Sequence, residues 1–177
     1  FILQDKLNHA SLLDAAQLSA AVQKRFLHAD VQSLQQRLES TEKNFKLVIS
    51  EGVFSMDGDQ PPLHEYIQLL TEQNALLIVD DAHGFGTMGK TGAGTHEAQD
   101  CIEGIDVYFG TFAKSMAGIG AFVASTEEIT NFLRYNMRSQ TFAKALPMPM
   151  VKPCKSTAPG ARFCGRRGWR CPWAVCC

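Results

Sequence analysis

The sequence predicts an α/β fold in which helices cover both faces of a mostly parallel sheet. Short apolar runs alternate along the chain with segments of helical periodicity, an alternation typical of βαβ units. The apolar runs are continuous, and continuous runs favour strands that a parallel sheet buries on both faces. No run reaches the roughly 20 apolar residues of a membrane-spanning helix, so no membrane span is expected.

The first expected elements lie before residue 52. The chain starts without an initiator Met and reads as though it begins inside a strand, which predicts a fragment of a longer protein. Asp30 can cap a helix whose apolar residues follow the i, i+3, i+7 spacing of a core-facing side, namely Val31, Leu34 and Leu38. The apolar run Lys46–Glu51 then predicts a buried strand.

The remaining expected elements follow Pro61 and Pro62, which suit the first turn of a helix. This helix carries Leu63, Ile67 and Leu70 on one side and nears its end at Asn74. Ser125 and Glu128 have the spacing of a capping box, which predicts a final helix through Phe132 and Leu133 to about Arg138. The strands expected between these helices are Leu76–Val79, Val107–Thr111 and Ala121–Ala124.

Composition divides the chain near residue 150. With 177 residues, 45% apolar content and net charge −1, it resembles a globular domain without a secretory leader, so a cytoplasmic location is expected. Residues 151–177 contain six of the 17 basic residues and none of the 18 acidic ones, and 17 − 6 leaves 11 basic residues elsewhere. These residues also hold five of the six cysteines, without a C-x-x-C pair or a neighbouring His. That spacing argues against zinc or nucleic-acid binding, and the lack of apolar periodicity predicts a frameshifted or disordered tail.

Polar groups follow three of the expected strands, where ligands bind in open α/β sheets. Asp80-Asp81-Ala82-His83 follows Leu76–Val79, Lys114 follows Val107–Thr111, and Ser55 follows Lys46–Glu51. Carboxylates at the end of a buried strand are costly unless they are used. Pyridoxal 5'-phosphate needs such a set: a lysine for its Schiff base, a carboxylate for its pyridinium nitrogen, and groups that hold its hydroxyl and phosphate.

Four segments resemble the α-oxoamine synthases, which are fold-type-I pyridoxal-phosphate enzymes. The segments are LNHAS at 7–11, EGVFSMDGD at 51–59, VDDAHG at 79–84 and GTFAKS at 110–115. The resemblance extends over about residues 5–150, and residues 110–123 and 133–150 look most like bacterial serine palmitoyltransferase-like members. It implies that residues 1–150 are the central part of a large domain that binds the cofactor, and that residues 151–177 are a tail foreign to the family.

The resemblance implies catalytic roles for three residues. Lys114 would form the Schiff base and move the Cα proton, and Asp80 would pair with the pyridine nitrogen. His9 would stack on the ring and help to hold the substrate carboxylate.

The resemblance implies cofactor contacts for three more residues and no metal. His83 would bind the ring hydroxyl, Thr111 would reach the phosphate, and Ser55 would lie against the cofactor. Family members are more than twice as long as this chain, so the chain alone is expected to lack activity.

The implied reaction joins an acyl-CoA to an amino acid with loss of carbon dioxide, in a homodimer. We expect L-serine with a long-chain acyl-CoA. The alternatives are glycine with a short acyl-CoA, as in glycine C-acetyltransferase, and L-alanine with a dicarboxylic acyl-CoA, as in 8-amino-7-oxononanoate synthase. A pyridoxal-phosphate aminotransferase and a non-catalytic partner subunit also stay open.

Several other residues carry weaker signals. Asp81 is expected to be structural, His28, His64 and His96 structural or exposed, and Cys101 a buried lone thiol. Residues 84–91 match the G-x-x-x-x-G-K-[ST] phosphate loop, but a glycine-rich stretch follows them where that loop needs a helix. The glycines are therefore expected to let the backbone turn beside the cofactor, and no nucleic-acid partner is expected.

Overall fold

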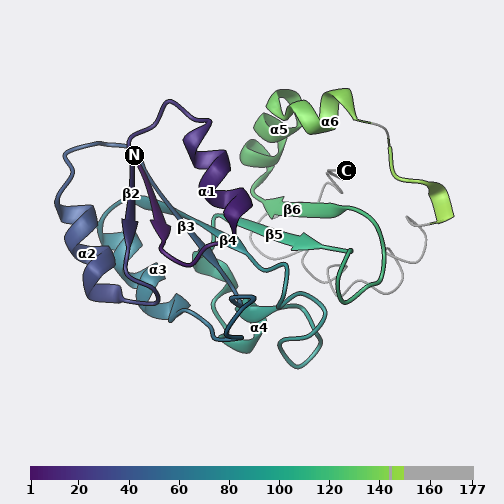
Figure 1. The fold of residues 1–177 in the computed structure, drawn as a ribbon, viewed down its shortest axis with the longest axis horizontal. Coiled ribbons are helices and arrows are strands. Elements are labelled where there is room, and N and C mark those ends of the chain that lie inside the picture. The colour runs from purple at the N-terminus through teal and green to yellow at the C-terminus, as the bar shows by residue number, and fades with distance from the viewer. Residues whose placement is uncertain (144, 150–177) are drawn as a thin grey trace.

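A six-stranded mixed sheet organises the chain. The computed structural model describes residues 1–143 and 145–149, and the sheet has the order β2-β1-β3-β4-β5-β6 (Figure 1). All neighbouring strands are parallel except β6, which runs antiparallel to β5. The strands are β1 (Ile2–Asp5), β2 (Gln23–Phe26), β3 (Lys46–Glu51), β4 (Ala75–Asp80), β5 (Val107–Thr111) and β6 (Ala121–Ser125). The predicted α/β class with a mostly parallel sheet is confirmed.

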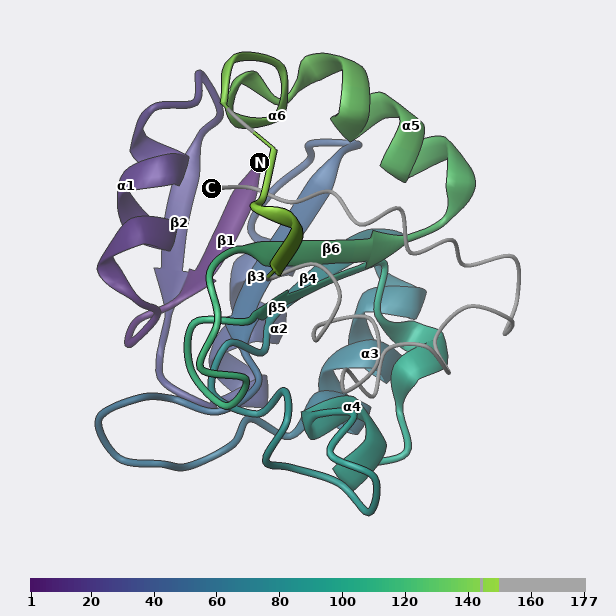
Figure 2. The same ribbon diagram turned by 90° about the vertical axis from the view of Figure 1, so that its right-hand side faces the viewer.

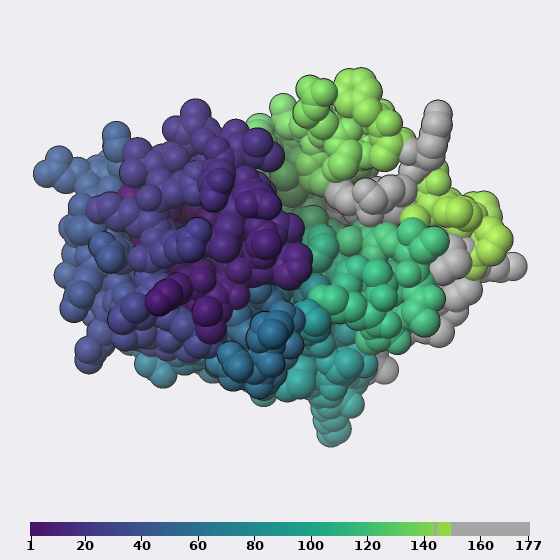
Figure 3. All heavy atoms as spheres, in the orientation of Figure 1, coloured from purple at the N-terminus to yellow at the C-terminus, as the bar shows by residue number. Residues whose placement is uncertain are grey.

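Helices lie on both sides of the strands. Figure 2 shows α1 on one side of the sheet and α3 on the other. The helices are α1 (Ala10–Gln17), α2 (Val31–Glu39), α3 (Leu63–Glu72), α4 (Thr95–Ala98), η1 (Ile102–Gly104, a 3-10 turn), α5 (Glu127–Asn136) and α6 (Arg138–Phe142). The space-filling view in Figure 3 shows residues near the N-terminus packed beside residues from the middle of the chain.

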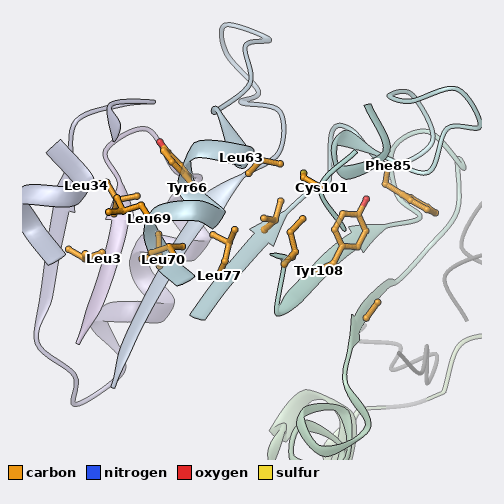
Figure 4. Close-up of a cluster of buried hydrophobic side chains, with 14 of the residues drawn as sticks. Leu3, Leu34, Leu63, Tyr66, Leu69, Leu70, Leu77, Phe85, Cys101 and Tyr108 are labelled. Atoms are coloured by element: carbon orange, nitrogen blue, oxygen red, sulfur yellow. The ribbon is translucent and has the colours of Figure 1, made fainter. Parts of the chain in front are cut away.

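The core lies between α2, α3 and the central strands. Leu34 and Leu63 from these helices are fully buried, as are Val48 and Leu77, which are partners in the β3–β4 ladder. Figure 4 shows the labelled side chains of α2 and α3 beside those of the strands. Removing a buried leucine side chain from such a core costs about 2–5 kcal/mol, so this packing contributes substantially to holding α2 and α3 against the sheet.

The observed helix α5 differs from the expected one at both of its ends. Thr126, rather than Ser125, caps α5 and accepts a bond from the Ile129 N–H. The Ser125 hydroxyl is not available for this, because it ends β6 and donates to the Asp106 carbonyl at 2.5 Å. The helix also ends at Asn136, where extended backbone at Met137 separates it from α6.

The described residues contain no helix that is long and apolar enough to cross a membrane. The prediction of a frameshifted or disordered tail concerns residues 151–177, which lie outside the residues that the structure describes.

Candidate active site

Acidic residues end three adjacent parallel strands at one edge of the sheet. Asp5 is the last residue of β1, Glu51 of β3 and Asp80 of β4. Glu51 and Asp80 are direct partners in the β3–β4 ladder. The carboxyl ends of parallel strands meet in this way at a single edge, where ligands of open α/β sheets bind.

Asp80 is a half-buried carboxylate with one oxygen still available. Its Oδ1 accepts a bond from the Ala82 N–H at 3.1 Å, and among the described residues none donates to its Oδ2. Burial raises the pKa of Asp80, while the Ala82 bond and the positive charge of Lys114 act in the opposite direction. Asp80 can therefore still accept a hydrogen bond from a ligand.

Lys114 is exposed on the turn that follows β5, and this turn is fixed on both sides. Phe112 is buried, and its carbonyl accepts a bond from the Gly118 N–H at 2.7 Å. The Ser115 hydroxyl donates to the Phe85 carbonyl at 2.7 Å. The positive charge of Lys114 influences the pKa values of Asp80, Glu51 and His83, and β5, which Lys114 follows, is the neighbour of β4 in the sheet.

His83 lies half-buried beyond β4. Burial lowers its pKa, and the positive charges of Lys114 and His9 lower it further. A neutral imidazole can both donate and accept a hydrogen bond, as a partner of a ring hydroxyl must.

His9 reaches the same edge from β1 and caps α1. Its backbone N–H donates to Glu51 Oε1 at 2.5 Å, and its Nδ1 lies 2.8 Å from the Ser11 hydroxyl. Glu51 is only 4% exposed, and burial raises its pKa. The sequence assigned Glu51 no role, although a carboxylate that ends an apolar buried strand could have been the signal.

Asp81 is a buried hydrogen-bond acceptor that holds the loop between β4 and α4 in place. It is fully buried and accepts bonds from the Thr95 N–H, the Thr95 hydroxyl and the Tyr108 hydroxyl at 2.6–2.7 Å. A Cβ at Gly52 or Gly84 would overlap its carboxylate. These glycines therefore permit a close approach to Asp81, and the segment 84–91 leads to α4 only after three further residues.

Thr111 and Ser55 are less closely tied to the cluster. The Thr111 hydroxyl donates to the Gly120 carbonyl at 3.1 Å and accepts from the Ala113 N–H at 3.2 Å. Ser55 is exposed on the turn after β3, and within the part of the chain that the structure describes its side chain makes no hydrogen bond. Their contacts with a cofactor stay predictions.

The remaining histidines and Cys101 range from buried to exposed positions. His96 and Cys101 are buried, and His64 is exposed on α3. His28 was expected to be structural or exposed; it joins the side chains of Asp5 and Asp59.

The donor set fits pyridoxal phosphate. It combines an accessible amine at Lys114, a carboxylate with an available oxygen at Asp80, and the imidazoles of His83 and His9 at one sheet edge. The described residues contain no group of three or more His, Cys, Asp or Glu side chains that could hold a metal ion.

Comparisons with known proteins agree with this chemistry. Residues 2–155 match the family model described as aminotransferase class I and II. The chain is 47% identical over 157 residues to cysteate-C-fatty acyltransferase of Capnocytophaga ochracea, covering 85% of this chain and 37% of that protein. It is 43% identical over 171 residues to 8-amino-7-oxononanoate synthase of Cellvibrio japonicus, covering 96% of this chain and 42% of that protein.

A solved structure adds a bound cofactor. A variant serine palmitoyltransferase from S. paucimobilis with a bound PLP–myriocin aldimine matches with a TM-score of 0.82 at 36% identity. The match covers 88% of this chain and 39% of that one. The chain thus spans about two fifths of the length of the proteins it resembles.

Proposed function

Because this chain belongs to the class I and II aminotransferases, and within them to the pyridoxal-phosphate-dependent α-oxoamine synthases, we propose that it forms the cofactor-binding centre of a C-acyltransferase. The reaction joins an acyl-CoA to an amino acid with loss of carbon dioxide. One observation carries the proposal: Asp80 and His83 lie at the carboxyl end of β4, and Lys114 follows the carboxyl end of the neighbouring parallel strand β5.

Lys114, Asp80 and His83 would each hold a different part of the cofactor. When bound, pyridoxal phosphate supplies a ring that accepts electron density from the substrate Cα. Lys114 would hold the cofactor through its Nζ and would move the Cα proton. Asp80 would keep a proton on the ring nitrogen by accepting a hydrogen bond from it, since within the described residues only Oδ1 of its carboxylate is engaged, by the Ala82 N–H. His83 would bind the ring hydroxyl as a neutral imidazole, the state that its lowered pKa favours.

The remaining predicted residues surround this group. His9 would stack on the ring and help to hold the substrate carboxylate, and the bond of its backbone N–H to Glu51 fixes its backbone. Thr111 would bind the phosphate through its hydroxyl, which donates to the Gly120 carbonyl in this structure. Ser55, exposed on the turn after β3, would lie against the cofactor.

We favour L-serine and a long-chain acyl-CoA as substrates. Two of the relatives described above are named for fatty or palmitoyl groups, cysteate-C-fatty acyltransferase and serine palmitoyltransferase. The second candidate is 8-amino-7-oxononanoate synthase, the name of several relatives at 39–43% identity. Three further possibilities stay predictions: glycine C-acetyltransferase activity, aminotransferase activity and a role as a non-catalytic subunit. The homodimer also stays a prediction.

The cofactor assignment is tested by trapping. The chain is incubated with pyridoxal phosphate, reduced with borohydride and mapped by peptide mass spectrometry. We expect the pyridoxyl label to concentrate on Lys114 and to disappear in Lys114→Ala. Lys90→Ala, which removes another exposed lysine, is the control and should label like the wild type. Equal labelling of Lys114 and the other exposed lysines would show that the assignment is wrong.

The substrate assignment is tested by CoA release. A protein of the relatives' length that contains this chain is supplied with serine, glycine, alanine or cysteate and with acyl-CoA thioesters of different length. Release with serine and long-chain acyl-CoA supports the favoured pair, while release with alanine and a dicarboxylic acyl-CoA supports the second candidate. Amino-group transfer to a 2-oxo acid without CoA release would favour an aminotransferase.

A further inference from the structure

His28 lies between two carboxylates that come from different parts of the fold. Its Nδ1 is 3.0 Å from Asp5 Oδ1, and its Nε2 is 2.6 Å from Asp59 Oδ2. Asp5 is fully buried at the end of β1, whereas the Asp59 side chain is 42% exposed. The His28 ring also meets Phe54 edge to face, with 4.4 Å between the ring centroids. These contacts join three segments near the proposed cofactor site.

One of these segments, residues 52–59, carries Ser55. It begins at Gly52, whose N–H donates to the Asp80 carbonyl at 2.8 Å. Its other backbone bonds are internal, from the Phe54 N–H to the Asp59 carbonyl and from the Gly58 N–H to the Phe54 carbonyl. Among the described residues, His28 is the only hydrogen-bond partner of the Asp59 side chain. The far end of the segment therefore depends on His28 and on the packing of Phe54.

The other carboxylate, Asp5, organises the segment that leads to His9. Besides His28, it accepts bonds from the Leu7 N–H and the Ala29 N–H, both at 2.9 Å. Two residues after Leu7, the His9 N–H bonds Glu51 at the end of β3. His28 is thus connected to the segments of both His9 and Ser55.

We propose that His28 is a positioning residue that holds residues 52–59, and with them Ser55, against the segment that carries His9. This role rests on the proposed function, in which both segments border the cofactor. His28 would touch neither the cofactor nor the substrate.

The protonation of His28 determines whether both links can exist. A charged imidazole donates from both nitrogens, but a neutral one has a single N–H. Although burial lowers the pKa of His28, the hydrogen bonds and charges of Asp5 and Asp59 raise it overall. These two carboxylates are the charged groups that act on it from β1 and from the segment after β3.

The direction of the pH effect follows from this raised pKa. The doubly linked state is fully present below the ordinary value of 6.5 and is lost as the pH rises through the raised value. Because Asp5 is fully buried and Asp59 is partly exposed, the link to Asp59 is the one that water can replace. Residues 52–59 should therefore loosen at alkaline pH.

Hydrogen–deuterium exchange of the full chain tests the tether without any cofactor. After correction for the intrinsic pH dependence of exchange, we expect protection of residues 52–59 to fall at least about tenfold between pH 6 and pH 9. His28→Gln should lower this protection at pH 6 by a similar factor and remove its pH dependence. His64→Gln, which changes an exposed histidine on α3, should behave like the wild type.

A second variant covers the case in which His28→Gln does not fold. Asp59→Ala removes a partly exposed carboxylate and leaves the pair of Asp5 and His28 intact, and it should loosen residues 52–59 in the same way. Wild-type protection of residues 52–59 in Asp59→Ala, or unchanged pH dependence in His28→Gln, would overturn the proposal.

A cofactor titration separates the two proposals. Both variants should bind pyridoxal phosphate about tenfold more weakly, yet label Lys114 at saturation. Unchanged affinity together with a loosened segment would show that the tether does not position the site. If Lys114 is not labelled even in the wild type, the proposed function fails, while the exchange data still decide whether His28 holds the segment.

Discussion

Asp80 and Asp81 are sequence neighbours, but their carboxylates have different surroundings. Asp80 keeps an oxygen available at the sheet edge, while Asp81 is fully buried and its bonds to Thr95 and Tyr108 hold the β4–α4 loop. Side chains alternate between the faces of a strand, so consecutive residues at a strand end point in different directions. Asp80 can therefore bind a ligand, while Asp81 stabilises the fold.

For Asp80 we predict a loss of turnover through charge. Asp80→Asn keeps the size of the side chain but cannot hold a proton on the ring nitrogen. In a protein of the relatives' length, CoA release should fall at least about 100-fold, which corresponds to roughly 2.7 kcal/mol of barrier. Asp57→Asn, at an exposed position, is the control. Turnover within a few-fold of wild type in Asp80→Asn would remove Asp80 from this role.

For Asp81 we predict a loss of stability. Asp81→Ala leaves the Thr95 N–H, the Thr95 hydroxyl and the Tyr108 hydroxyl without their shared acceptor. Unsatisfied buried donors are costly, so the free energy of unfolding in urea should fall by about 3 kcal/mol. Asp57→Ala should change it by less than about 0.5 kcal/mol, and a similar small change in Asp81→Ala would contradict the structural role.

For single residues, the sequence predicted those that follow apolar strands. It did not predict hydrogen bonds between side chains that lie far apart in the sequence. Lys114, Asp80 and His83 were predicted because each follows a recognisable strand. The bond between His9 and Glu51 spans 42 positions, and the bonds of His28 to Asp5 and Asp59 span 23 and 31. Such contacts depend on strand order, which a local pattern does not contain.

At the scale of elements, burial decided what could be predicted. Strands β3 and β5 have the predicted bounds because their residues form continuous apolar runs, as is typical of central parallel strands. Strand β2 was missed because it lies at the sheet edge, where only Phe26 of its four residues is buried. Helix α1, with a single buried residue, was also missed.

The cap of α2 gives an element-scale prediction. Asp30 was predicted as the cap, and its carboxylate accepts a bond from the Ser33 N–H at 2.8 Å. Asp30→Ala should lower the free energy of unfolding by about 1 kcal/mol, as measured in urea. Gln32→Ala, on the exposed side of the same helix, should have a smaller effect than Asp30→Ala. Equal effects of the two changes would mean that the cap contributes nothing.

At the scale of the whole molecule, buried His96 should make stability fall in acid. Burial lowers the pKa of His96 from 6.5 to about 4. Between pH 6.5 and pH 4, His96 is therefore protonated in the unfolded chain but not in the folded one. This contribution to stability is complete above pH 6.5 and is lost as the pH falls towards 4, by roughly 3 kcal/mol. His96→Phe should show a shallower fall in urea unfolding than His64→Phe, and equal slopes would contradict this assignment.

The strand order also has a consequence for how the chain is made. Strand β1 pairs with both β2 and β3, and Ile2 faces Leu47 across the β1–β3 ladder. A ribosome synthesises β1 before β3, so one edge of β1 stays unpaired until β3 has emerged. Unpaired strand edges can pair with other chains and so promote aggregation. A chaperone that shields nascent chains is therefore expected to matter most while residues 27–51 are being synthesised.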